Sequence, residues 1–370
     1  MFLKSRVRRS VRLVTAVCAA ALVVGSCAAA PPDDNSQTGV GSTPGSTPGG
    51  APVPAPPPNV RPPVTQPVTT YVAKGDRLGI GNCPVLPNNN VFHADITTLP
   101  VLANSAAIVR AAGAQVKVRP AFSAGVHEGS RGGLPINIVD SSKMKQSTVF
   151  SLLHGPVDLG QHPIPQNPRI EGYPGIAWDQ HMLLFDTATC NSHEFFLVRP
   201  PTALTDFWWA DSGVQLDMRS NEMNKGSATA SGFSMLAGMV RYDEVTRGSI
   251  NHAVGFAFPT ISKLSPVWPA SGSDGKSNDP NAPRMGMMFR LRSDVDLNSL
   301  APTARLIAKA MQTHGAILSD SNHEGIALAG ENDDRWDDAD LATLSKLTMA
   351  DFEVVDPTPM KVADDSYAVR

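Results

Sequence analysis

Short segments of alternating hydrophobic and polar residues predict a chain built mainly from β-strands. One alternating segment covers 250–258, in which His252 shares a face with large apolar side chains and small residues form the other face. Alternation of the same period covers 177–185, 193–199 and 288–297. Because successive side chains of a strand point to opposite faces, we expect a strand at each position and a hairpin of 177–185 with 193–199.

Two segments late in the chain have helical periodicity instead. The first, 302–313, begins with Pro302 and carries an apolar stripe, and the second, 338–347, begins with aspartates, which favour a helix N-terminus. Between them, 316–320 and 326–329 are expected to form a hairpin. Many short strands with a few helices predict a mainly β fold, namely one β-sandwich or jelly-roll-like domain with a few peripheral helices near the C-terminus.

Residues 1–26 do not follow this pattern and resemble a lipoprotein signal peptide. Basic residues precede a short apolar run, which ends in Val24-Gly25-Ser26-Cys27, a match to the bacterial lipobox. We therefore expect lipidation of Cys27 and anchoring at the extracytoplasmic face of the cell membrane. The alternative is ordinary cleavage near 28–30, which would give a freely secreted protein.

The rest of the chain divides by composition. Residues 27–70 are rich in Pro, Gly, Ser and Thr and are expected to form a disordered tether, since such a segment cannot bury enough apolar surface to fold. Residues 71–360 have the composition of a globular domain, which we expect to be β-rich, and 361–370 form a C-terminal tail.

Cysteines and charge narrow the class of protein further. Two cysteines remain in the folded part, Cys83 and Cys190, and export to an oxidising compartment predicts a disulfide between them. Without the five basic residues of the signal peptide, 26 basic side chains face 34 acidic ones, a net charge of −8. An acidic chain argues against nucleic-acid binding and against electrostatic attachment to anionic lipid. Membrane contact is therefore expected through the lipid anchor alone.

The sequence lacks the GxSxG, HExxH, Walker and GxGxxG motifs, so we predict no metal, no cofactor and no nucleotide. Carboxylates and histidines recur in two places, which favours acid–base chemistry. The candidate catalytic residues are Asp179, His181, Asp243, Glu244 and His252. Two alternatives stay open: His181 is a strand histidine satisfied by its neighbours, and 241–244 is a salt-bridged turn.

A second set of residues is suited to binding sugars. Planar hydrogen-bonding groups near aromatic rings hold sugars by paired hydrogen bonds and ring stacking, and tryptophan next to a long polar loop, 270–284, is typical of a binding loop. The candidate substrate-binding residues are Arg219, Asn221, Arg241 and Trp268.

Several motifs together suggest a family. Cys83-Pro84, FHADI, LDMRSN and GMVRYDEVTRGSINHA resemble those of a family of uncharacterised secreted bacterial proteins that is common in actinobacteria. The resemblance implies one exported domain and no particular reaction. We expect a cell-envelope lipoprotein whose domain binds a polysaccharide and, if it is an enzyme, acts as a glycan-cleaving hydrolase or lyase. The alternative is a non-catalytic envelope interaction or scaffold protein.

Overall fold

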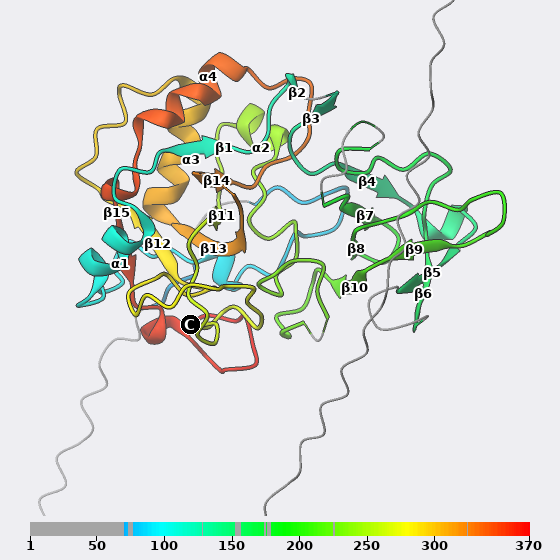
Figure 1. The fold of residues 1–370 in the computed structure, drawn as a ribbon, viewed down its shortest axis with the longest axis horizontal. Helices are drawn as coiled ribbons and strands as arrows, with labels where there is room; N and C mark the ends of the chain where they lie inside the picture. The colour runs from blue at the N-terminus through cyan, green and yellow to red at the C-terminus, as the bar shows by residue number, and fades with distance from the viewer. Residues whose placement is uncertain are drawn as a thin grey trace, which may run out of the picture. The chain divides into compact units, whose positions relative to one another are not determined.

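Strand β11 (Val254–Phe258) lies inside a six-stranded mixed sheet in the computed structural model (Figure 1). The structure describes residues 70–72, 77–127, 129–151, 157–173, 175, 179–224, 226–323 and 325–370. The expected signal peptide, the expected lipidation site Cys27 and the expected tether up to residue 69 lie outside these residues. Within the described part, no helix is both long enough and apolar enough to cross a bilayer.

The six-stranded sheet combines parallel and antiparallel neighbours. β11 is parallel to the strand on one side, β13, and antiparallel to the strand on the other, β14. The order across the sheet is β1 (Val118–Pro120), β14 (Ile326–Leu328), β11, β13 (Ala316–Ser321), β12 (Met288–Leu291) and β15 (Phe352–Val355).

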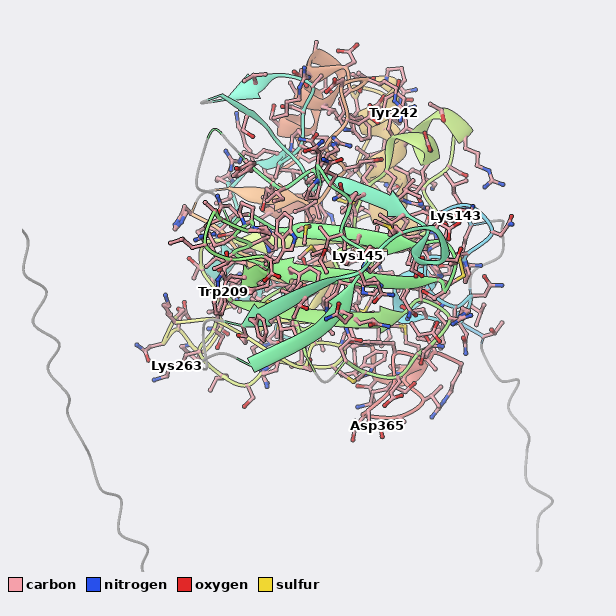
Figure 2. The ribbon with its side chains drawn as sticks, turned by 90° about the vertical axis from the view of Figure 1, so that its right-hand side faces the viewer. Lys143, Lys145, Trp209, Tyr242, Lys263 and Asp365 are labelled. Atoms are coloured by element: carbon pink, nitrogen blue, oxygen red, sulfur yellow. A yellow bond between two sulfur atoms is a disulfide. The ribbon has the colours of Figure 1, made fainter. Side chains whose placement is uncertain are left out.

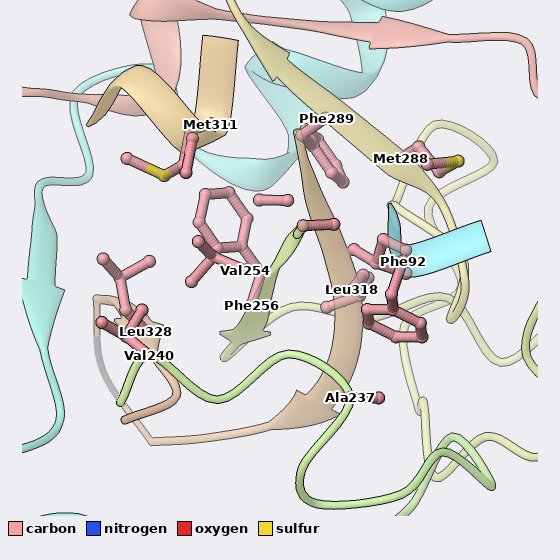
Figure 3. Close-up of a cluster of buried hydrophobic side chains, with 14 of the residues drawn as sticks. Phe92, Ala237, Val240, Val254, Phe256, Met288, Phe289, Met311, Leu318 and Leu328 are labelled. Atoms are coloured by element: carbon pink, nitrogen blue, oxygen red, sulfur yellow. The ribbon is translucent and has the colours of Figure 1, made fainter. Parts of the chain in front are cut away.

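Side-chain size explains why β11 can occupy the interior of the sheet. On one face Phe256 is fully buried and contacts the ring of Phe289, in the cluster of apolar side chains shown in Figure 3. On the other face Gly255 donates its N–H to the carbonyl oxygen of Gly238 over 2.8 Å. The small residues that alternate along β11 therefore allow another backbone segment to lie directly against the strand.

Helices cover parts of this sheet. Helix α3 (Pro302–Thr313) matches the sequence prediction, with proline in its first turn and Met311 buried beside the sheet. The predicted helix at 338–347 forms as α4 (Asp338–Ala342) followed by a 3-10 turn, η3 (Thr343–Lys346). The remaining helical segments are α1 (Ser105–Ala112), α2 (Tyr242–Arg247), η1 (Val91–His93), η2 (Ser141–Lys143), η4 (Met349–Asp351) and η5 (Thr358–Met360).

Two smaller mixed sheets form the other part of the domain (Figure 1, right). In β7, Leu183 joins the main core, whereas Met182 and Leu184 join a second core that both small sheets share. The four-stranded sheet has the order β10 (Ser212–Asp217), β8 (Asn191–Phe196), β7 (Met182–Asp186) and β4 (Ile136–Val139). The three-stranded sheet has the order β6 (Val157–His162), β5 (Ser147–Ser151) and β9 (Trp208–Ala210), and a separate ribbon pairs β2 (Val126–His127) with β3 (Ser130–Arg131).

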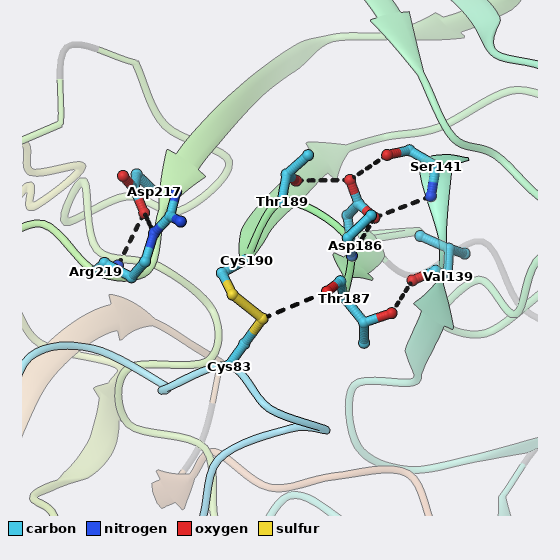
Figure 4. The surroundings of a disulfide bond; sticks show 10 residues. Cys83, Val139, Ser141, Asp186, Thr187, Thr189, Cys190, Asp217 and Arg219 are labelled. Carbon is cyan, nitrogen blue, oxygen red and sulfur yellow. Dashed lines mark hydrogen bonds and ion pairs between the residues drawn. A yellow bond between two sulfur atoms is a disulfide. The ribbon is translucent and has the colours of Figure 1, made fainter. Parts of the chain in front are cut away.

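The structure confirms the disulfide between Cys83 and Cys190, whose Cα atoms are 5.3 Å apart (Figure 4). Cys190 closes the turn between β7 and β8, where Asp186 accepts hydrogen bonds from Ser141 and Thr189. The bond therefore joins the start of the described chain to the four-stranded sheet.

Several sequence predictions need correction. The mainly β class is confirmed and so is the β7–β8 hairpin, but a jelly-roll or sandwich topology is not, because all three larger sheets mix parallel and antiparallel pairs. The helices do not gather near the C-terminus, since α1 and α2 come earlier. Segments 316–320 and 326–329 form no hairpin with each other, because β11 is inserted between β13 and β14. The predicted strands are also shorter: β11 begins at Val254, β7 at Met182, and β12 ends at Leu291.

Candidate functional site

His181 lies just before β7 and forms an ion pair with Glu171. Its Nδ1 is 2.6 Å from Glu171 Oε2, and its Nε2 is 3.2 Å from the carbonyl oxygen of Ala228. Both partners are acceptors, so both ring nitrogens donate and the imidazole is a cation in this arrangement. Burial lowers the pKa of His181, but the hydrogen bond and charge of Glu171, together with Asp179 and Asp320, outweigh burial and raise it.

Two further carboxyls surround this ion pair. Asp320 lies near the end of β13, where burial raises its pKa to about 6 despite the opposing charge of His181. Asp179 is exposed, and its pKa is also raised, first by desolvation and then by the charge of Glu171, with His181 opposing. We call Glu171, Asp179, His181 and Asp320 the acid–base cluster. It contains one imidazolium and three carboxyls.

Local backbone structure holds the cluster in place. Gln180 has a left-handed φ of 47°, and it separates Asp179 from His181 at the point where the chain enters β7. The backbone N–H of Leu197 donates to the carbonyl oxygen of Asp179 over 2.9 Å, which ties this corner to the segment after β8. On the opposite side, the hydroxyl of Ser321 donates to the carboxylate of Asp274 in the long polar loop. The loop thus reaches the edge of the cluster.

A buried carboxyl, Glu194 of β8, lies close enough to His181 for their charges to interact. It accepts hydrogen bonds from the hydroxyls of Ser192 and Ser234 and from the backbone N–H of Met235. Burial raises its pKa above the usual value even though these bonds and His181 lower it. These hydrogen bonds indicate that Glu194 fixes residues 234–235 against β8.

Sequence reasoning missed Glu171 and Asp320. Glu171 stands in the sequence EGYPG, where neither strand nor helix periodicity marks it. Asp320 follows the apolar run of β13 and begins a polar stretch, Asp-Ser-Asn-His, which is the only sequence signal for it. Ligand sites often lie at the carboxyl ends of buried strands, so this polar stretch could have indicated Asp320.

Arg241, Glu244 and His252 form a second, separate group. Glu244 Oε1 is 2.9 Å from Arg241 Nη2, and Glu244 Oε2 is 3.1 Å from His252 Nε2. All three residues are buried, and Arg241 also donates to the carbonyl oxygens of Leu78 and Gly79. Burial would raise the pKa of Glu244, but His252 and Arg241 lower it to about 2. Arg241 and Glu244 lie at the start of helix α2, where the Glu244 carboxylate also accepts a hydrogen bond from the Arg241 backbone N–H.

The two groups do not meet. Asp320 is paired with Ala257 near the end of β11, whereas His252 precedes the first residue of that strand, Val254. At about 3.3 Å per residue, the strand alone separates them by roughly 10 Å. Strand register therefore places Asp320 and His252 toward opposite ends of β11.

The other candidate residues make local contacts. Asp243 is exposed and forms an ion pair of 3.2 Å with Arg335. Arg219 pairs with Asp217 at 2.8 Å (Figure 4), and both side chains are about half exposed. Asn221 donates to Asn89 and accepts from Asn90, and the indole N–H of Trp268 donates to the carbonyl oxygen of Ser366. Within the described chain, no hydrogen bond or ion pair links these side chains to the acid–base cluster.

One cavity lies beside a segment that carries candidate binding residues. The segment that holds Arg219 and Asn221 borders a cavity of about 300 Å³, whose wall includes Phe92, Met218 and Phe233. In the part of the chain that the structure covers, no group of three His, Cys, Asp or Glu side chains could hold a metal ion.

No protein-family model, no curated protein and no solved structure matches this chain.

Proposed function

We propose that this protein is an exported, lipid-anchored envelope protein whose domain binds a polysaccharide and cleaves it at the acid–base cluster. The observation that supports this function is a carboxyl with a raised pKa, Asp320, close to the Glu171–His181 ion pair and to a second carboxyl, Asp179. Asp320 keeps its proton to about pH 6, while the Glu171–His181 ion pair places fixed charges beside it. A buried carboxyl that keeps its proton to this pH is suited to serve as a general acid, and a second, more exposed carboxyl nearby can serve as the base.

The proposed reaction is hydrolysis of a glycosidic bond. The Asp320 hydroxyl transfers its proton to the glycosidic oxygen as the carbon–oxygen bond breaks, and exposed Asp179 removes a proton from the water that attacks the anomeric carbon. His181 stabilises the carboxylate that Asp320 becomes. The Glu171 carboxylate keeps His181 protonated through its 2.6 Å hydrogen bond.

The test uses the soluble domain with dextran, laminarin, galactan, arabinan and solubilised peptidoglycan, and measures release of oligosaccharides. Asp320→Asn and Asp179→Asn are each expected to lower kcat at least 100-fold on the polymer that is cleaved, because general acid–base catalysis contributes about 10²–10⁴-fold. Activity should fall as pH rises above about 6, where Asp320 loses its proton. Asp217→Asn, which changes an exposed local ion pair, is the matched control and should leave kcat unchanged. Full activity of Asp320→Asn would contradict the proposed role.

A non-catalytic scaffold is the second candidate. It is favoured by the Arg241–Glu244–His252 group and by the Asp243–Arg335 pair, which are local structural contacts. A protein that neither binds nor cleaves any polymer of the panel would support this candidate.

A further inference from the structure

Three aromatic side chains lie together on the three-stranded sheet. The ring centroids of Phe150 and Phe207 are 5.0 Å apart, those of Phe207 and Trp209 are 5.0 Å apart, and those of Phe150 and Trp209 are 5.8 Å apart. All three side chains are partly exposed, and Trp209 is labelled in Figure 2. We call these three residues the aromatic face.

Strand register places the aromatic face on the outer side of the sheet. Val149 of β5 is paired with Trp208 of β9, and both belong to the second core. The next pair, Phe150 with Trp209, must point the opposite way, because side chains alternate along both strands. Large aromatic side chains thus remain on a solvent-facing sheet surface, although a fully polar outer face would suffice for folding.

Hydrogen-bonding groups flank the aromatic face. On the same sheet the amide of Gln161 donates to the hydroxyl of Thr148 over 2.5 Å, and Gln161 is exposed. Rings beside amides and hydroxyls suit a sugar chain, since pyranose rings have an apolar C–H face and a polar rim of hydroxyls.

The aromatic face is connected to the acid–base cluster by one pair of residues. The backbone groups of Trp209 and Arg199 exchange two hydrogen bonds, of 2.7 and 3.0 Å. The Arg199 guanidinium in turn donates to the side-chain carbonyl of Gln180. Gln180 stands between Asp179 and His181, so these hydrogen bonds join the strand of the aromatic face to the segment that carries the cluster.

We propose that the aromatic face is a subsite for a linear polysaccharide, which it binds by ring stacking while a neighbouring sugar unit occupies the acid–base cluster. This inference rests on the proposed function, because it adds a second binding position for the same substrate. A subsite away from the reacting bond strengthens binding of long chains, and a fragment too short to reach it gains nothing.

The test compares Trp209→Ala and Phe207→Ala with the matched control Leu204→Ala, which truncates an apolar side chain that is 95 % exposed. Substrates are whichever of the five polymers is cleaved, and its disaccharide. The aromatic variants are expected to raise KM for the polymer at least tenfold with less than a twofold change in kcat. For the disaccharide the change in kcat/KM should stay below twofold. Trp209→Phe, which keeps a ring, should restore most of the binding, and this distinguishes stacking from a loss of folding.

Binding is measured separately by affinity electrophoresis of Asp320→Asn in gels that contain each polymer. Retention that disappears in Asp320→Asn carrying Trp209→Ala supports the subsite even when the wild-type protein releases no product, in which case only the proposed cleavage fails. Equal losses of kcat/KM on the polymer and on the disaccharide would overturn the subsite. An equal loss of kcat/KM in Leu204→Ala, or no retention by any of the five polymers, would also overturn it.

Discussion

At the scale of single residues, Glu244 is held by the buried side chains of Arg241 and His252 and is predicted to stabilise the fold. Replacing Glu244 by Gln leaves the Arg241 guanidinium buried without its counter-charge, which typically costs about 3–5 kcal/mol. We expect Glu244→Gln to lower the free energy of unfolding by about 3 kcal/mol or more, as measured by urea denaturation at pH 7. The matched control, Asp217→Asn, breaks an exposed pair and should change it by less than about 1 kcal/mol.

The effect of Glu244→Gln on the free energy of unfolding is predicted to depend on pH. The pKa of Glu244 is about 2 in the folded protein against 4.5 ordinarily, so its contribution is complete above pH 4.5 and is lost as pH falls toward 2. The difference between wild type and Glu244→Gln should therefore shrink over that window. A constant difference from pH 7 to pH 2 would show that this ion-pair group is not its source.

Sequence could identify single site residues only where they stand in a pattern. Asp179 and His181 are two positions apart, and that spacing suggested a shared site. Their actual partners, Glu171 and Asp320, come from a turn and from the end of a distant strand. The pairing of β13 with β11 fixes where Asp320 lies, and no local pattern encodes it.

At the scale of elements, the small residues of β11 are predicted to be essential for close packing. A Cβ added to Gly238 would lie 2.5 Å from the backbone nitrogen of Gly255, so the two segments would have to separate. We expect Gly238→Ala to lower the unfolding free energy by about 1–3 kcal/mol. Gly226→Ala is the matched control, because its added Cβ would meet its nearest neighbours at an ordinary 3.6 Å. Equal stability of the two variants, measured by urea denaturation, would contradict the packing argument.

Element prediction succeeded where local signals and tertiary structure agree. Helix α3 has proline in its first turn and an apolar stripe, and its bounds are those predicted from sequence. The turn between β7 and β8 was likewise predicted from two short strands. The hairpin of β13 with β14 was wrong because the shortest connection does not decide pairing when a third strand, β11, fills the space between them.

At the scale of the whole molecule, the disulfide links two regions that sequence distance keeps apart. Cys83 lies in the segment that packs on the main core, Cys190 lies in the turn of the four-stranded sheet, and 107 positions separate them. Closing so long a loop restricts the unfolded chain and contributes about 4–5 kcal/mol in the chain-entropy model. We expect the double variant Cys83→Ser/Cys190→Ser to lose about 2–5 kcal/mol of unfolding free energy. Its denaturant dependence should be steeper, because the unfolded chain exposes more surface without the link. Wild type unfolded with a reductant should match the double variant, and an unchanged urea midpoint in both would show that the bond does not restrict the unfolded state.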